Sequence, residues 1–186
     1  VIAINSLIDP KLLYKNIYEN EIHPVIVIEN KISYGMFVGL KKLDFYSAKY
    51  STDQYPVIKY TPIVDQPNLT IVTYGGIAQD VIDSILEIFR KLDTITEVIV
   101  LTKLSPLDIS HVLESVSITK RIIVIEEGNK EFGVGAEVIS QVVEHLGPKV
   151  DLAKRIGALS VPIPSVKSLE NHVLPNTTII EDIANE

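Results

Sequence analysis

The chain has 186 residues, of which 17 are Lys or Arg and 24 are Asp or Glu, so its formal net charge is −7. Its length suits one domain with some remainder, and an apolar fraction of 46% provides a core and excludes a disordered chain. The absence of Cys excludes disulfides, thiolate zinc sites and cysteine nucleophiles. The acidic balance argues against nucleic acid and anionic membranes as partners, because both require concentrated positive charge.

The apolar runs are short. The longest, such as residues 25–28 and 98–101, fall far below the ~20 residues that a membrane-spanning helix needs. The N-terminus shows neither a basic start nor an apolar signal stretch, and it opens on Val1, which suggests a fragment. We expect a cytoplasmic protein with no membrane partner.

Short β-branched runs alternate with longer amphipathic segments, a pattern typical of a parallel sheet covered by helices. Most of these runs are continuously apolar, as strands buried on both faces must be. The expected strands are residues 1–5, 24–30, 69–74, 97–102, 121–126 and 154–158.

Four segments carry helix signals. Asp9 and Pro10 form an N-cap and first-turn pair, and residues 79–92 carry an apolar stripe. Ser105 begins a capping box that predicts a helix to about residue 117, and a further helix is expected at 137–146, closed by Gly147 and Pro148.

Between Gly35 and Pro67 no period is sustained. This composition predicts a linker with at most a short strand near residues 55–60, and therefore a domain boundary.

Two motifs could carry chemistry. Gly133 to Ala136 precede a helix and could present N–H groups to a phosphate, but close helix packing explains the glycines better, because the dinucleotide fingerprint is incomplete. Glu126 and Glu127 end a strand where open sheets bind ligands, yet neighbouring strand residues point to opposite faces. A structural or solvated role is favoured for both carboxylates.

The four histidines are scattered, and no nucleophile elbow or phosphate-binding loop occurs. Composition and spacing alone therefore predict an acidic α/β domain without assigning a reaction.

Five blocks in a characteristic order resemble a known family. They are HPVIVIENKISYG (23–35), LTIVTYGGIAQDVIDS (69–84), VLTKLSPLD (100–108), IEEGNKEFGVGAEV (125–138) and RIGALSVPIPSVKSLENHVLP (155–175). Together they are similar to the C-terminal half of the β subunit of a 2-oxo acid dehydrogenase E1 component, of the pyruvate dehydrogenase type. Ser160 and Ser165 depart from the family, which usually has an Asp and an aromatic residue there.

The resemblance implies an α/β fold with three layers, α/β/α, around a five-stranded, mostly parallel sheet. Residues 1–35 would be the C-terminal remnant of the thiamine pyrimidine-binding domain, residues 36–66 a linker, and residues 67–186 a transketolase C-terminal-like domain. The implied boundary coincides with the one that composition predicts.

Enzymes of the family oxidatively decarboxylate a 2-oxo acid on thiamine diphosphate, with magnesium, and pass the acyl group to a lipoyl arm of E2. The Glu that activates the cofactor lies in a segment that this sequence lacks. The resemblance therefore implies no catalytic or cofactor-binding residue here, and we expect the fragment alone to be inactive.

The resemblance also implies a potassium site built from backbone carbonyls in the turn before residues 24–30. The matching residues are Ile17, Tyr18, Asn20 and His23. Side-chain identity matters little to carbonyl ligands. One extra residue near Ile22 would distort the turn, and the alternative is an ordinary helix C-terminus.

By resemblance the partners are the E1 α subunit or region, a second E1 β, and the peripheral-subunit-binding domain of E2. Docking requires an exposed apolar surface, for which the candidates are residues 132–138 and 161–166. One alternative is another thiamine enzyme, of the transketolase or deoxyxylulose-phosphate synthase type. The other is a receiver-like regulatory module, which would need an acidic cluster where Tyr74, Gly75 and Gly76 stand.

Overall fold

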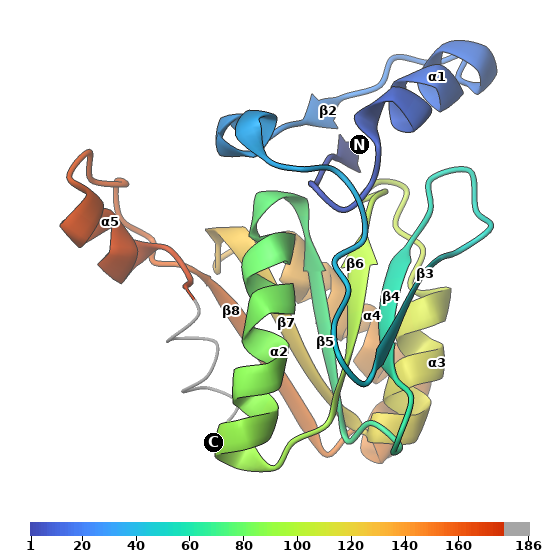
Figure 1. Ribbon diagram of the computed structural model, residues 1–186, viewed down its shortest axis with the longest axis vertical. Helices are drawn as coiled ribbons and strands as arrows, with labels where there is room; N and C mark the ends of the chain where they lie inside the picture. The colour runs from blue at the N-terminus through green and yellow to red at the C-terminus, as the bar shows by residue number, and fades with distance from the viewer. Residues whose placement is uncertain (177–186) are drawn as a thin grey trace.

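Two β-sheets organise the part of the chain that the computed structural model describes, residues 1–176 (Figure 1). The smaller sheet pairs β1 (Ile2–Ala3) with β2 (Val27–Ile28) in parallel. The larger sheet has six strands in the order β3-β4-β6-β5-β7-β8. Its strands are β3 (Tyr46–Tyr50), β4 (Ile58–Pro62), β5 (Leu69–Tyr74), β6 (Thr96–Leu101), β7 (Arg121–Asn129) and β8 (Leu152–Ala158).

The four strands β6, β5, β7 and β8 run parallel, as their continuous apolar runs predict. Every residue of β6 is buried, and so is every residue of β5 except its last. Successive side chains point to opposite faces, so Ile71 and Val72 enter different cores. The predicted α/β fold with a mostly parallel sheet is confirmed.

Helices cover both faces of this sheet, which gives three layers (Figure 1). On one face, α2 (Ala78–Leu92) buries Val81, Ile82, Ile85 and Ile88 against the core that contains Ile71. On the other, α3 (Ser110–Thr119) and α4 (Val134–Leu146) pack against the core that contains Val72. α3 begins later than predicted, at Ser110, whose N–H donates to the Asp108 carboxylate at 2.9 Å, so Asp108 lies before the helix and not inside it.

The sheet has six strands, where the family resemblance implies five. The additional residues come from the segment expected to be a linker, where β3 and β4 form an antiparallel pair and β4 also pairs with β6. Ile58 and Tyr60 of β4 are buried while Lys59 between them is not, so this strand follows the alternating pattern of a sheet with one covered face. The predicted short strand near residues 55–60 overlaps β4, and β3 was missed.

The N-terminal segment forms the small sheet, α1 (Pro10–Asn20) and a short 3-10 helix, η1 (Lys31–Gly35). α1 begins as predicted, with the Asp9 carboxylate accepting the N–H of Lys11 at 2.9 Å. β1 and β2 are shorter than the expected strands at 1–5 and 24–30.

Two further 3-10 helices, η2 (Gly75–Ile77) and η3 (Gly147–Lys149), and a short helix, α5 (Lys167–Val173), complete the described chain. None of the helices described within residues 1–176 has the length and apolar character needed to cross a membrane.

Candidate functional site

The carboxyl ends of β5, β6 and β7 lie at one edge of the sheet, where open α/β sheets bind ligands. The chain passes from β5 to β6 on one side and then crosses to β7 on the other, so the strand order reverses at β5. The residues at this edge include Tyr74, Glu126 and Glu127, together with the two glycines that follow β5.

Glu126 is fully buried at this edge, and its carboxylate is held by two donors. One oxygen accepts the Tyr74 hydroxyl at 2.7 Å, and the other accepts the N–H of Gly135 at 3.0 Å. Gly135 lies in the first turn of α4, where an anion would be stabilised by free N–H groups and the helix dipole. The protein's own carboxylate therefore occupies the place that a phosphate would take.

The glycines before α4 are explained by this carboxylate. A Cβ on Gly133 would lie 2.4 Å from a Glu126 oxygen, and one on Gly135 would lie 2.7 Å from it. Close packing, the interpretation favoured from sequence, therefore accounts for both glycines.

The Tyr74 hydroxyl is a fixed donor to this site. Burial raises its pKa well above the usual value, and the hydrogen bond to Glu126 and the negative charge of that carboxylate raise it further. Tyr74 therefore stays protonated at all physiological pH values and keeps its hydrogen bond to Glu126.

Glu127 has a different partner and does not converge with Glu126. It accepts the side-chain N–H of Asn30 at 2.9 Å. Burial raises the pKa of Glu127, the Asn30 hydrogen bond opposes that shift, and the charge of Asp80 adds to it. The Asn30 side chain lies so close to Gly76 that a Cβ on Gly76 would come within 2.1 Å of its Nδ2 atom.

The N-terminal segment closes the rest of this edge. The N–H of Ala3 donates to the carbonyl of Thr102 at 2.8 Å, and the N–H of Leu104 donates to the carbonyl of Val1 at 2.8 Å. Figure 1 shows the small sheet seated beyond the upper ends of β5 and β6. Within residues 1–176, no group of three His, Asp or Glu side chains could hold a metal ion. At this edge the N-terminal segment therefore packs against the larger sheet of the same chain.

Comparison with known proteins decides the family. The model of the transketolase C-terminal domain matches residues 59–180. The chain belongs to this family. The match begins inside β4 and includes every later strand of the larger sheet.

Curated relatives of this transketolase-type chain are pyruvate dehydrogenase E1 component β subunits. That of Chaetomium thermophilum is 30% identical over 87% of this chain and 42% of the relative. That of Porphyra purpurea is 28% identical over 100% of this chain and 54% of the relative. The chain therefore spans about half the length of these relatives, and the resemblance to the C-terminal half of an E1 β subunit is confirmed.

A solved structure described as a split gene transketolase, inactive β4 tetramer, shares the fold with a TM-score of 0.55 and 18% identity. It covers 64% of this chain and 39% of its own. At that identity the likeness supports the fold of this transketolase-type domain and nothing more specific.

The predicted potassium ligands of this transketolase-type chain lie at and after the C-terminus of α1. The carbonyl of Ile17 accepts the N–H of Glu21 at 3.1 Å, which closes the helix. Tyr18 and Asn20 belong to the last turn, whose carbonyls have no intrahelical donors, and His23 lies in the exposed loop beyond. Carbonyl oxygens at the negative end of a helix suit a cation. The potassium site stays a prediction.

The predicted docking segments lie side by side. The Ser160 hydroxyl donates to the Glu131 carboxylate at 3.3 Å, and the N–H of Lys130 donates to the carbonyl of Ala158 at 3.0 Å. Phe132 is fully exposed, but Val138 of the same predicted segment is buried in the core. The exposed large apolar residues of the two segments are Phe132, Val161, Ile163 and Val166, which we call the Phe132 face.

The role of Asn30 was not predicted from the sequence: its side chain joins the N-terminal segment to Glu127, 97 positions away. No local pattern identifies such a partner. The only signal was the second glycine after β5, which leaves room for the Asn30 side chain.

Proposed function

We propose that this chain is the assembly half of a thiamine diphosphate-dependent 2-oxo acid dehydrogenase E1 β subunit. The parent enzyme would oxidatively decarboxylate a 2-oxo acid and transfer the acyl group to lipoyl-E2. The single observation that supports the assembly role is the exposure of the Phe132 face. The carboxyl ends of the parallel strands, by contrast, are covered by the chain's own residues.

The Phe132 face consists of exposed apolar side chains. Among the described residues Phe132 is fully exposed, and Val161, Ile163 and Val166 are each about half exposed. Two segments that hydrogen bonds join next to Phe132 together expose four large apolar side chains, and exposed apolar surface of this kind commonly marks an interaction site. Aromatic residues in the centre of such a surface commonly dominate binding energy. The Phe132 face is therefore suited to bury itself against another polypeptide.

We infer three partners for the parent enzyme: the E1 α subunit or region, a second E1 β, and the peripheral-subunit-binding domain of E2. The family supports this inference, since the relatives are components of a multi-subunit enzyme by name. The Phe132 face is assigned to the E2 domain, because the family offers its C-terminal region there.

The chemistry of the parent would be supplied by thiamine diphosphate with magnesium. The edge of the sheet in this chain offers no free anion site for a diphosphate, because Glu126 occupies the N-terminus of α4. We therefore expect the chain alone to be inactive and not to bind the cofactor. Calorimetric titration with thiamine diphosphate and Mg²⁺ tests this: no saturable heat is expected, and saturable binding would contradict it.

The assembly role is tested by sedimentation velocity with a recombinant E2 peripheral-subunit-binding domain. The chain should bind this domain, and Phe132→Asp should weaken binding by roughly thirtyfold, the effect of losing one central aromatic anchor. Phe37→Asp is the matched control, because Phe37 is also fully exposed but lies in the loop after η1. Equal binding by the two variants, or no binding by the unchanged chain, would refute the assignment.

A further inference from the structure

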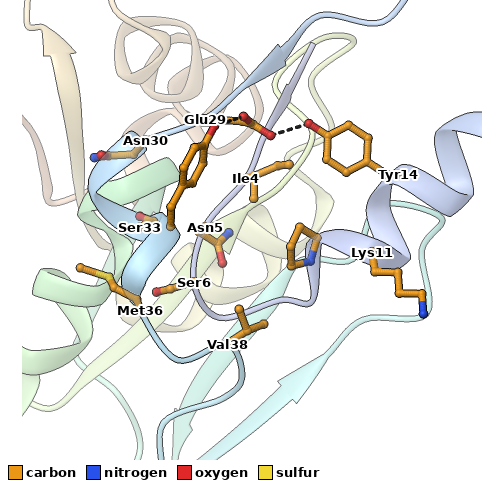
Figure 2. A pocket seen from close by; sticks show the side chains of 12 residues that line it. Ile4, Asn5, Ser6, Lys11, Tyr14, Glu29, Asn30, Ser33, Met36 and Val38 are labelled. Carbon is orange, nitrogen blue, oxygen red and sulfur yellow. Dashed lines mark hydrogen bonds between the residues drawn. The ribbon is translucent and has the colours of Figure 1, made fainter.

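A cavity of about 350 Å³ lies within the N-terminal segment (Figure 2). Its volume is within the range of small-molecule sites. The apolar side chains that line it are Ile4, Pro10, Met36 and Val38. These residues come from three parts of the segment, the stretch after β1, the start of α1 and the stretch after η1, so the cavity depends on the folded arrangement of the segment.

One charged group faces this cavity in a fixed position. The Glu29 carboxylate accepts a hydrogen bond from the Tyr14 hydroxyl on one oxygen and from the Tyr34 hydroxyl on the other, the latter at 2.5 Å. Tyr14 lies on α1 and Tyr34 on η1, so two elements hold the carboxylate between them. Figure 2 shows the Tyr14 ring with its hydroxyl directed at the Glu29 carboxylate.

Among the described residues, the Glu29 carboxylate forms no ion pair. The two phenol hydrogen bonds lower the pKa of Glu29, so the group is ionised at neutral pH. Within residues 1–176 no Lys, Arg or His lies within ion-pair distance of it. Lys11 also lines the cavity, but its side chain extends away from the carboxylate (Figure 2).

A second polar group, the amide of Asn5, lies among the lining residues. Asn5 is 2% exposed, and its side-chain oxygen accepts the N–H of Leu7 at 3.0 Å, which fixes the orientation of the amide. Its Nδ2 atom has no acceptor among the described residues. An unsatisfied buried donor costs stability unless something supplies an oxygen.

We propose that this cavity binds a small aliphatic amine that also carries a carbonyl oxygen, with its ammonium on Glu29, its carbonyl toward Asn5 and its aliphatic body against Ile4 and Val38. The ammonium would form an ion pair with the Glu29 carboxylate, which two tyrosine hydroxyls hold in place but which has no ion pair among the described residues. The carbonyl satisfies the orphaned amide, and the apolar walls receive the carbon chain. The site is separate from the Phe132 face and does not depend on the proposed function.

The test uses leucinamide as the probe and the full chain labelled with ¹⁵N. Leucinamide should produce saturable shifts of the Asn5 side-chain NH₂ resonances at millimolar concentration. The same molecule without its amino group, 4-methylpentanamide, should bind roughly tenfold more weakly, as expected for the loss of one charged contact. Absence of saturation, equal affinities for the two compounds, or shifts confined to other residues would overturn the proposal.

Substitutions add an independent check. Glu29→Gln removes the charge from an exposed side chain and should abolish the preference for leucinamide over 4-methylpentanamide. Glu21→Gln is the matched control, because Glu21 also accepts a tyrosine hydroxyl, that of Tyr55 at 2.8 Å, but does not line the cavity. A preference retained in Glu29→Gln, or lost in Glu21→Gln, would refute the assignment of the ammonium to Glu29. The comparison of the two compounds on the unchanged chain stands even if a variant folds poorly.

Discussion

The carboxylate of Glu126 accepts the backbone N–H of Gly135 at 3.0 Å, across nine positions of sequence. This contact joins β7 to the first turn of α4 and buries a carboxyl group that forms no ion pair among the described residues. The Tyr74 hydroxyl supplies the second donor. A buried carboxylate needs such donors, because an unpaired one is strongly destabilising.

Gly135→Ala should destabilise the protein, although Ala normally stabilises a helix by about 1 kcal/mol over Gly. The new Cβ would lie 2.7 Å from a Glu126 oxygen and 3.0 Å from Val124, both buried and unable to move aside. Overpacking of this kind costs about 1–3 kcal/mol. Urea unfolding should show a net loss of stability.

Gly35→Ala is the control for that substitution, since a Cβ there would meet nothing within 4 Å. It should leave the unfolding midpoint nearly unchanged. If Gly135→Ala raised the midpoint as an ordinary helix substitution would, the tight contact between α4 and Glu126 would be wrong.

Tyr74→Phe should destabilise the protein by about 1–3 kcal/mol, because it leaves one buried Glu126 oxygen without its donor. Tyr18→Phe removes the same hydroxyl from a side chain that is 90% exposed and should change stability little. Chemical unfolding of both variants measures the difference. Equal stabilities would mean that the phenol donor contributes nothing to holding Glu126.

Tyr14→Phe should raise the pKa of Glu29, because the largest cause of its lowered pKa is the hydrogen bond from Tyr14. The carboxyl ¹³C shift of Glu29, followed by NMR during an acid titration, measures this change. In the unchanged chain, the same hydrogen bond raises the pKa of Tyr14 to about 12.

Tyr18→Phe again serves as a control for Glu29, because Tyr18 lies on the same helix but donates no hydrogen bond to that carboxylate. Its Glu29 titration should match that of the unchanged chain. A pKa of Glu29 that is insensitive to Tyr14→Phe would show that the carboxylate is not held as the structure describes.

The central strands could be predicted from sequence because burial on both faces demands continuous apolar residues. The run at Leu69–Tyr74 has this character and forms β5. β3 could not be recognised in the same way. It lies at the edge of the sheet, where none of its residues is fully buried, so its sequence YSAKY carries little apolar pattern.

In the candidate sites, too, contacts between residues close in sequence could be predicted, whereas contacts between distant residues could not. The N-cap at Asp9 is a local signal, and the structure confirms it. The cluster of Glu29 with Tyr14 and Tyr34 joins α1 to η1 through a carboxylate after β2, and no spacing rule links those positions. Likewise, the pairing of Asn30 with Glu127 depends on how the N-terminal segment seats on the sheet.

Glu127→Gln should stabilise the protein at neutral pH. Burial raises the pKa of Glu127 above its ordinary value of 4.5, so the folded state binds that proton more tightly than the unfolded state does. Stability contributed by this group is therefore full below pH 4.5 and is lost as the pH rises through the raised pKa of the folded state. Gln carries no charge, and its oxygen still accepts the Asn30 amide, so the variant avoids the loss.

The free energy of unfolding should therefore be higher for Glu127→Gln than for the unchanged chain at pH 7, and the difference should shrink toward zero as the pH falls below 4.5. Urea titrations at several pH values measure both curves. Glu144→Gln, at an exposed position on α4, removes one negative charge without relieving any burial and should give nearly parallel curves. A Glu127→Gln variant that is less stable at pH 7 would mean that the ionised carboxylate, through Asn30, holds the N-terminal segment on the sheet more strongly than burial opposes it.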